Sequence, residues 1–225
     1  MKTVRNDNAA LATARNSVYE LLASVFRTGP SAAMIDELKG SELSTMLSQL
    51  GFPVEEHLHR ATPHQLSEDL DVEYTRLFIG PGSHISPHES IHTEHGGNAI
   101  NELWGRETVK VKAFIEEAGL TISEQFEGLP DHISAEFELM AHLAGHEAEL
   151  WTNEKPDEAA LCHDIQRLFF AEHIDQWVPL FCAKINQQEG VSFYKAMADL
   201  TVSVLEFERD IFEISEQPAA LQATA

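Results

Sequence analysis

The histidines near the middle of the chain are the side chains that most directly suggest chemistry. Four histidines and two glutamates fall within twelve residues, namely His84, His88, Glu89, His92, Glu94 and His95. Imidazole and carboxylate groups bind zinc and iron, so a metal-dependent helical enzyme using the His84–His95 cluster is the alternative function. However, Pro87 and the neighbouring glycines prevent one regular helix from aligning these groups, so His88-Glu89-Ser90-Ile91-His92 does not read as a helical HExxH site, and no CxxC spacing is present. We therefore expect loop histidines that bind no metal.

A second histidine pair has helical spacing. His142 and His146 are four residues apart, and Glu138 precedes them by one turn. A metal site in a helical bundle needs a second such pair on a facing helix. His163 and His173 are ten residues apart and do not supply it. We expect this helix face to be solvated.

Nucleophile and cofactor motifs are missing from the sequence. There is no GxSxG motif and no glycine-rich phosphate loop. Ser90 follows a histidine and a glutamate, but adjacency along the chain does not make these three residues a catalytic triad. The two cysteines, Cys162 and Cys182, have no CxxC partner and lie among apolar residues, which predicts reduced, buried thiols. The sequence thus predicts no catalytic residue, no cofactor and no enzyme activity.

Helices must position whatever site the chain has. Apolar residues recur at spacings of three and four, and we find no period-two alternation and no Asn-Gly or Asp-Gly hairpin turn. An N-terminal helix should bury Leu11, Val18, Leu22 and Val25. The other predicted helices span 62–78, 104–118, 132–151, 157–170, 175–186 and 192–214.

Local signals refine these helices. Thr62 is a predicted N-cap followed by Pro63, Gly119 is a predicted stop, and Asp131 is the predicted N-cap of the helix at 132–151. Apolar stripes should include Leu161, Ile165, Leu168 and Phe169 in one helix. In the last helix they should include Met197, Leu200, Val204, Phe207 and Ile211.

Two segments interrupt the helical pattern. Residues 79–98, rich in glycine, proline and histidine, predict a long irregular central loop, and residues 126–130 form a short linker. A loop of this length inside a compact domain is usually functional. We expect one all-α, bundle-like domain over residues 1–225, with a disordered tail at 216–225.

Charge restricts the partners. Lysine and arginine total 15 and aspartate and glutamate total 37, which gives a net charge of −22. This surface should repel nucleic acid and anionic membranes and attract a basic partner. No apolar run approaches the roughly 20 residues of a membrane span, and the N-terminus does not read as a signal peptide. We expect a cytoplasmic protein with no stable membrane insertion.

Two short motifs remain as candidate binding sites. Leu77, Phe78 and Ile79 lead into Gly-Pro-Gly, which ends a helix and could leave apolar side chains to line a groove for a peptide helix. Leu129-Pro130-Asp131-His132 starts a helix, where the Asp131 carboxylate could also pair with a guanidinium group.

Taken in order, four segments carry a family resemblance. These segments are, in order, EYTRLFIGPG, SPHES, LPDHISAEFELMAHLA and HIDQWVPLF. Through them the chain resembles the TorD/DmsD/NarJ family of redox-enzyme maturation chaperones, especially its TorD/DmsD branch. The resemblance spans roughly residues 70 to 185. It implies an all-α fold of about ten helices without a catalytic centre.

The same resemblance implies a function and a site. Such a chaperone binds the twin-arginine signal peptide and apoprotein of a molybdopterin oxidoreductase, of the dimethyl-sulfoxide or trimethylamine-N-oxide reductase type, and delays export until the cofactor is inserted. The implied peptide-binding residues are Leu77, Phe78, Gly80, Pro81, Pro87, Ser90, Asp131, His132 and Trp177. Where many members carry aromatic residues after the Pro-x-x-Ser element, this chain has Ile91-His92-Thr93-Glu94. Relatives occur as monomers and as domain-exchanged dimers, for which residues 126–130 are a plausible hinge.

Overall fold

The protein is all-α, as expected, and is described here from a computed structural model. The structure describes residues 2–40, 45, 61–80, 84–93, 105–120, 128–189 and 192–214. Within these ranges the regular elements are helices, close in number to the expected ten, and the sole β-type pairing is an isolated bridge between His88 and His132. Pro81, His95, Trp104, the tail at 216–225 and residues 126–127 of the expected hinge lie outside the described residues.

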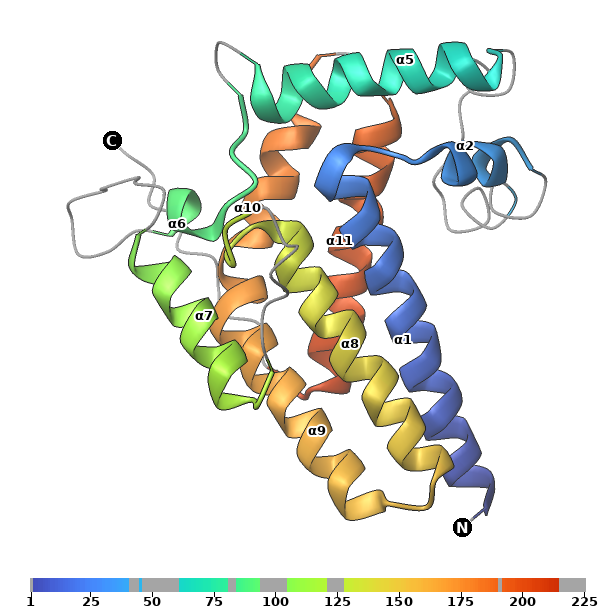
Figure 1. Cartoon of the computed structure of the whole chain (residues 1–225), viewed down its shortest axis with the longest axis vertical. Helices are drawn as coiled ribbons and strands as arrows, with labels where there is room; N and C mark the ends of the chain where they lie inside the picture. The colour runs from blue at the N-terminus through green and yellow to red at the C-terminus, as the bar shows by residue number, and fades with distance from the viewer. Residues whose placement is uncertain are drawn as a thin grey trace.

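Two long helices form the spine of the molecule. α1 (Lys2–Thr28) and α8 (Ile133–Thr152) lie side by side and run in opposite directions (Figure 1). They pack closely because α8 presents small residues to α1. At Gly145 an added Cβ would lie only 3.2 Å from the Asn16 side-chain nitrogen. That nitrogen donates a hydrogen bond to the Ala141 carbonyl oxygen, at 2.9 Å.

The second half of the chain completes the bundle. α9 (Pro156–Phe169), the π-helical turn η2 (Phe170–Ile174) and α10 (Asp175–Asn186) form one nearly continuous rod, which α11 (Ser192–Ile211) packs against. The expected apolar stripes are partly wrong. Leu161, Leu168 and Phe207 are exposed, and so is Leu11 in α1, because each lies beside the buried stripe of its helix and not within it.

A buried ion-pair network ties the bundle together. The Arg15 guanidinium on α1 donates to both carboxylate oxygens of Glu208 on α11, at 2.6 and 2.7 Å, and to Glu147 on α8, at 3.1 Å. All three residues are buried. Gln166 on α9 donates to Glu147 at 2.8 Å, so four helices share one polar network. Sequence periodicity gave no sign of these partners.

The remaining helices cover the end and side of the bundle. α5 (Pro63–Tyr74) crosses one end near α2 (Ala32–Lys39), and α7 (Arg106–Glu117) lies along the side (Figure 1). The Thr62 N-cap is confirmed, since its hydroxyl accepts from the Gln65 N–H, and Gly119 ends α7 with a φ of +75°. The helix expected to reach Phe78 instead changes to the π-helical turn η1 (Thr75–Ile79) after Tyr74.

An aromatic core fills the space under α5. Phe78 on η1 lies at its centre, with ring centroids 5.1 Å from Tyr74, 5.6 Å from Tyr194 and 5.7 Å from Phe181. Cys162 and Cys182 are free, buried thiols, as predicted. Within the described ranges, no helix combines the length and apolarity that crossing a membrane requires.

Candidate functional site

The central loop, expected to be irregular, is anchored to the start of α8. Its described part, residues 84–93, contains a short helix, α6 (Glu89–His92). The Pro87 carbonyl accepts a hydrogen bond from the Ile133 N–H, and the Asp131 carbonyl accepts one from the Glu89 N–H, both at 2.9 Å. We call this region, residues 85–92 against residues 131–133, the loop junction.

Asp131 caps a different helix from the one expected. Its Oδ2 accepts a hydrogen bond from the Ser90 N–H in the first turn of α6, at 3.2 Å, and the residue is fully buried. The N-cap of α8 is His132, whose Nδ1 accepts from the Ser134 N–H, also at 3.2 Å. The prediction that Asp131 caps α8 was therefore wrong by one residue. The carboxylate instead faces the returning loop, which the local sequence does not reveal.

Imidazoles crowd the loop junction. The rings of His88 and His132 meet edge to face, with centroids 4.9 Å apart, and His92 stacks on Trp177 at 5.2 Å. Burial lowers the pKa of His132 to about 3, and the positive charges of His88 and Arg27 act in the same direction. The negative charge of Asp131 opposes this shift only in part. Burial likewise lowers the pKa of His92 to about 4. Both imidazoles are therefore neutral near pH 7.

The loop histidines do not gather into a metal site within the described residues. His84 is exposed, His88 bonds the Ser86 hydroxyl, and His92 bonds the Ser86 carbonyl and the Lys184 ammonium. His88 and His92 thus point to their own partners instead of a common centre. The metal-dependent enzyme built on this cluster finds no support in that geometry.

A buried polar network lies beneath the loop junction. The Trp177 indole N–H donates to Glu136 at 3.0 Å, and His173 Nδ1 bonds Glu89 Oε2 at 2.9 Å. Burial and then the nearby Glu89 carboxylate raise the pKa of Glu136 well above its ordinary value. Burial also raises the pKa of Glu89. These groups join α6, α8, η2 and α10, and they fix the loop against the bundle.

The structure brings the sequence-predicted site residues together, but mostly inside the protein. The buried members of that set are Leu77, Phe78, Pro87, Ser90, Asp131 and Trp177. Gly80 and His132 are partly exposed. Of the apolar triplet at 77–79, only Ile79 is exposed. The buried side chains therefore support the surface around the loop junction but contribute little to that surface themselves.

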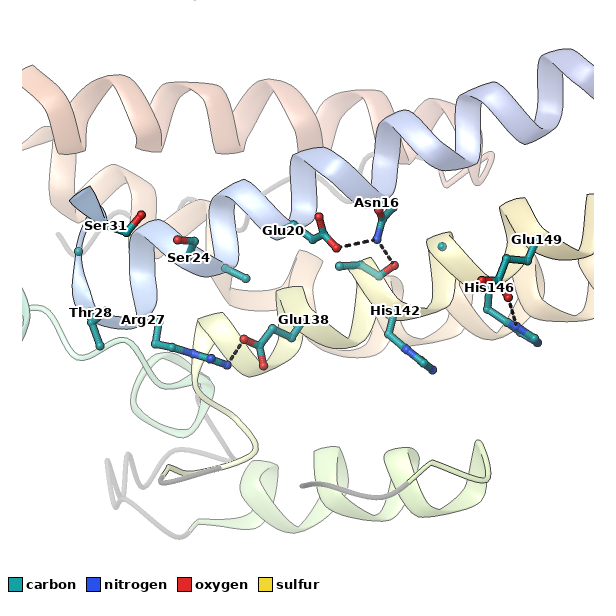
Figure 2. A pocket seen from close by; sticks show the side chains of 14 residues that line it. Asn16, Glu20, Ser24, Arg27, Thr28, Ser31, Glu138, His142, His146 and Glu149 are labelled. Carbon is teal, nitrogen blue, oxygen red and sulfur yellow. Dashed lines mark hydrogen bonds and ion pairs between the residues drawn. The ribbon is translucent and has the colours of Figure 1, made fainter. Parts of the chain in front are cut away.

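A groove lies between α1 and α8. It has a volume of about 550 Å³, and we call it the α1–α8 groove. Figure 2 shows side chains of both helices directed toward it, among them Asn16, Glu20, Arg27, Glu138 and His142. Arg27 pairs with Glu138. The positive charge of Arg27 also adds to the effect of burial in lowering the pKa of His132, so this groove adjoins the loop junction.

The charged residues of the α1–α8 groove are predominantly acidic. Glu20, Glu138 and Glu149 line it, whereas Arg27 is its only arginine or lysine among the described residues. His142 and His146 also line it; both are exposed, as predicted, and His146 lies 3.9 Å from Glu149. Carboxylates on two facing helices can accept hydrogen bonds from a cationic ligand. Motif spacing does not reveal the groove, because its residues come from helices more than 100 residues apart.

Comparison with known proteins identifies the family. The family model described as "Nitrate reductase delta subunit" matches residues 42–183, which is more than half of the chain. The chain is 25% identical over 219 residues to a protein of Shewanella oneidensis named "Chaperone protein TorD", covering 92% of this chain and 94% of that protein. A protein of the same name from Vibrio cholerae is 22% identical over 208 residues, covering 87% and 90%. The chain therefore belongs to the nitrate reductase delta subunit family, which confirms the TorD/DmsD/NarJ resemblance of its sequence motifs.

Proposed function

We propose that this protein is a redox-enzyme maturation chaperone. It binds the twin-arginine signal peptide and the apoprotein of a molybdenum-cofactor oxidoreductase in the cytoplasm, and it performs no chemistry of its own. Full-length relatives that carry the name "Chaperone protein TorD" support the class of function. The family motifs at residues 70–185 support the kind of client.

The acidic α1–α8 groove is the observation that carries the peptide-binding part of the proposal. A guanidinium group presents several N–H donors in a planar fork and pairs well with carboxylates. Glu20 and Glu149 stand along the groove, and the Arg27–Glu138 pair already shows how an arginine binds at one point in it. The net charge of −22 would also speed the encounter with a basic peptide.

The residues of the loop junction have a positioning role in this proposal. Asp131, Ser90 and Pro87 hold the loop on the start of α8, and His132 begins that helix. The start of α8 in turn places Glu138 beside Arg27. A change at the loop junction would therefore alter peptide binding by moving the residues of the groove. Separately, exposed Ile79 and partly exposed Gly80 would contact the apolar part of a peptide.

Purification of the native partner tests the proposal. Tagged full-length protein, isolated from its own cells under mild conditions, should bring down a precursor that still carries its signal peptide. In a second assay, a peptide with the client's signal sequence should bind more tightly than the same peptide with both arginines replaced by glutamine. Recovery of only mature proteins, or equal affinity for the two peptides, would reject signal-peptide recognition.

A further inference from the structure

Carboxyl groups are unusually concentrated in the interior beneath α6. Glu89, Glu107, Asp131 and Glu136 are each at most 3% exposed. Burial raises the pKa of Glu89, and the negative charges of Glu107 and Asp131 raise it further. Burial and the charges of Glu89 and Asp131 do the same for the pKa of Glu136. Buried carboxylates are costly unless a proton, an ion pair or a metal ion neutralises them. This cluster does not line the α1–α8 groove.

Two of these carboxylates converge with a histidine on one point. A ligand atom from each of Glu89, Glu107 and His173 lies within 4.8 Å of the other two, and all three residues are buried. They come from three elements, α6, α7 and η2. They also line one cavity of about 680 Å³, whose wall includes exposed Glu172 and Gln176, so that solvent can reach it.

One carboxylate oxygen of Glu89 lacks a hydrogen-bond partner within the described part of the chain. Glu89 is 1% exposed, and its Oε2 bonds His173, but its Oε1 has no hydrogen-bond partner among the described residues. Buried carboxylate oxygens are nearly always satisfied by a donor or a cation. An incompletely satisfied carboxylate, beside a second carboxylate and an imidazole at the wall of a cavity that solvent can reach, points to a cation-binding site.

We propose that Glu89, Glu107 and His173 bind one divalent ion of the zinc or manganese class. Two carboxylate oxygens and one imidazole nitrogen form a donor set suited to such ions. The ion would replace the proton between His173 Nδ1 and Glu89 Oε2, and the cavity leaves room for water at its remaining coordination positions. Lys110, which pairs with Glu107 at 3.0 Å, is half exposed and can turn toward solvent when the ion enters.

This site differs from the metal site considered for the loop histidines. It shares Glu89 with that cluster but uses none of His84, His88, His92 or His95, and its single histidine is distant from them in sequence. The bound ion would fasten α6, and hence the central loop, to α7 and η2. The expectation of a metal-free protein rested on ligand spacing along the chain, which cannot detect ligands contributed by three separate helices.

Metal titration of the full-length protein tests the proposal without any client or peptide. Protein stripped with a chelator and dialysed is titrated with Mn²⁺, with free Mn²⁺ followed by electron paramagnetic resonance, and with Zn²⁺ by calorimetry. We expect one ion per chain and a higher melting temperature with metal. Glu107→Gln and His173→Gln should each weaken binding at least tenfold. Circular dichroism of the metal-free variants shows whether they are folded.

A matched control removes the exposed histidines of the α1–α8 groove. His142→Ala combined with His146→Ala should leave the affinity and stoichiometry unchanged, because those side chains are not part of the site. Retention of full affinity by folded Glu107→Gln and His173→Gln would overturn the proposal. So would loss of binding in the His142–His146 double variant, or failure of the parent protein to bind either ion in large excess.

Discussion

The carboxylate of Asp131, at the start of α8, caps α6 by accepting a hydrogen bond from the Ser90 N–H, 41 residues earlier in the chain. Two backbone hydrogen bonds, Glu89 N–H to the Asp131 carbonyl and Ile133 N–H to the Pro87 carbonyl, flank this contact. The side chain is fully buried. Asp131 therefore acts first on the conformation of the loop, and any effect on a bound peptide passes through that conformation.

Substitutions at Asp131 should separate positioning from direct contact. Asp131→Asn keeps an acceptor for the Ser90 N–H, so stability and peptide affinity should both change little. Asp131→Ala leaves that N–H buried without a partner, at a cost of about 1–3 kcal/mol in the free energy of unfolding. Urea denaturation and peptide titration on the same preparations measure both quantities. If Asp131→Asn lost peptide affinity while remaining as stable as the parent, the carboxylate would contact the peptide itself.

The stability of the protein should depend on pH through His132. Its Nδ1 can accept the Ser134 N–H only when unprotonated, and burial holds its pKa at about 3, against an ordinary value of 6.5. As the pH falls below 6.5, the unfolded chain gains a proton that the folded protein does not accept until about pH 3. The contribution of His132 to stability is therefore complete above pH 6.5 and declines progressively between 6.5 and 3.

His132→Asn isolates this effect, because asparagine is a good N-cap that does not titrate. Urea denaturation at pH 7 and pH 5 should show a smaller loss of stability in the variant than in the parent. His92, whose pKa is also lowered by burial, contributes equally in both proteins and cancels in the comparison. His88, Asp131 and Arg27, which act on His132, are unchanged in the variant. Equal losses in parent and variant would mean that His132 is not the titrating group.

The Arg15 network should be a major source of stability. Arg15→Met leaves the buried carboxylates of Glu208 and Glu147 without their shared cation, which should cost roughly 3–5 kcal/mol. The double variant with Glu208→Gln should lose less than the sum of the two single changes, because the two side chains interact directly. Chemical denaturation of the single and double variants gives the coupling free energy.

A surface pair serves as the control for Arg15. Arg167 and Asp164 on α9 are 3.7 Å apart, with 41% and 62% of their side chains exposed, so Arg167→Met should cost less than about 1 kcal/mol. Comparable losses for Arg15→Met and Arg167→Met would show that burial does not strengthen the network.

The helices could be predicted from sequence because their signals are local. The Thr62 N-cap, the Gly119 stop and the span 175–186 all depend on neighbouring residues, and all three agree with the structure. The errors also have a local origin. Leu161 and Phe207 fit a helical period but lie one position away from the buried stripe, and the periodicity of a short window does not fix the angle of that stripe.

The site was harder to predict because distant residues build it. The family motifs identified Asp131 and Ser90, but only the folded chain shows that they bond each other. Glu107 lies outside the family motifs, and His173 begins one of them without an implied role; both meet Glu89 because α7 and η2 pack beside α6. Likewise, Glu20 and Glu138 share a groove because α1 and α8 are antiparallel neighbours. Such pairings follow from tertiary packing, which the spacing along one helix does not encode.

Charge in the α1–α8 groove should tune peptide affinity. Glu20→Gln is a conservative test, because the amide oxygen can still accept from Asn16, which donates to Glu20 at 3.4 Å. Only the negative charge is lost. An exposed ion pair contributes about 0.2–1 kcal/mol, which corresponds to at most about a fivefold change in affinity. Glu20→Gln combined with Glu149→Gln should therefore weaken binding of a twin-arginine peptide several-fold, without a change in melting temperature.

Salt provides the second half of this test. Exposed charges are screened over about 10 Å in 0.1 M salt, whereas apolar contacts are not weakened by screening. Parent affinity should fall as salt rises without vanishing, and the Glu20–Glu149 double variant should fall less, because part of its attraction is already gone. Glu158→Gln on α9, exposed and paired with Lys155 outside the groove, is the matched control and should behave as the parent. Calorimetry at low and high salt measures all three proteins. An identical salt dependence of peptide affinity in the parent and the double variant would place the peptide away from this groove. A loss of peptide affinity in Glu158→Gln as large as that in Glu20→Gln would do the same.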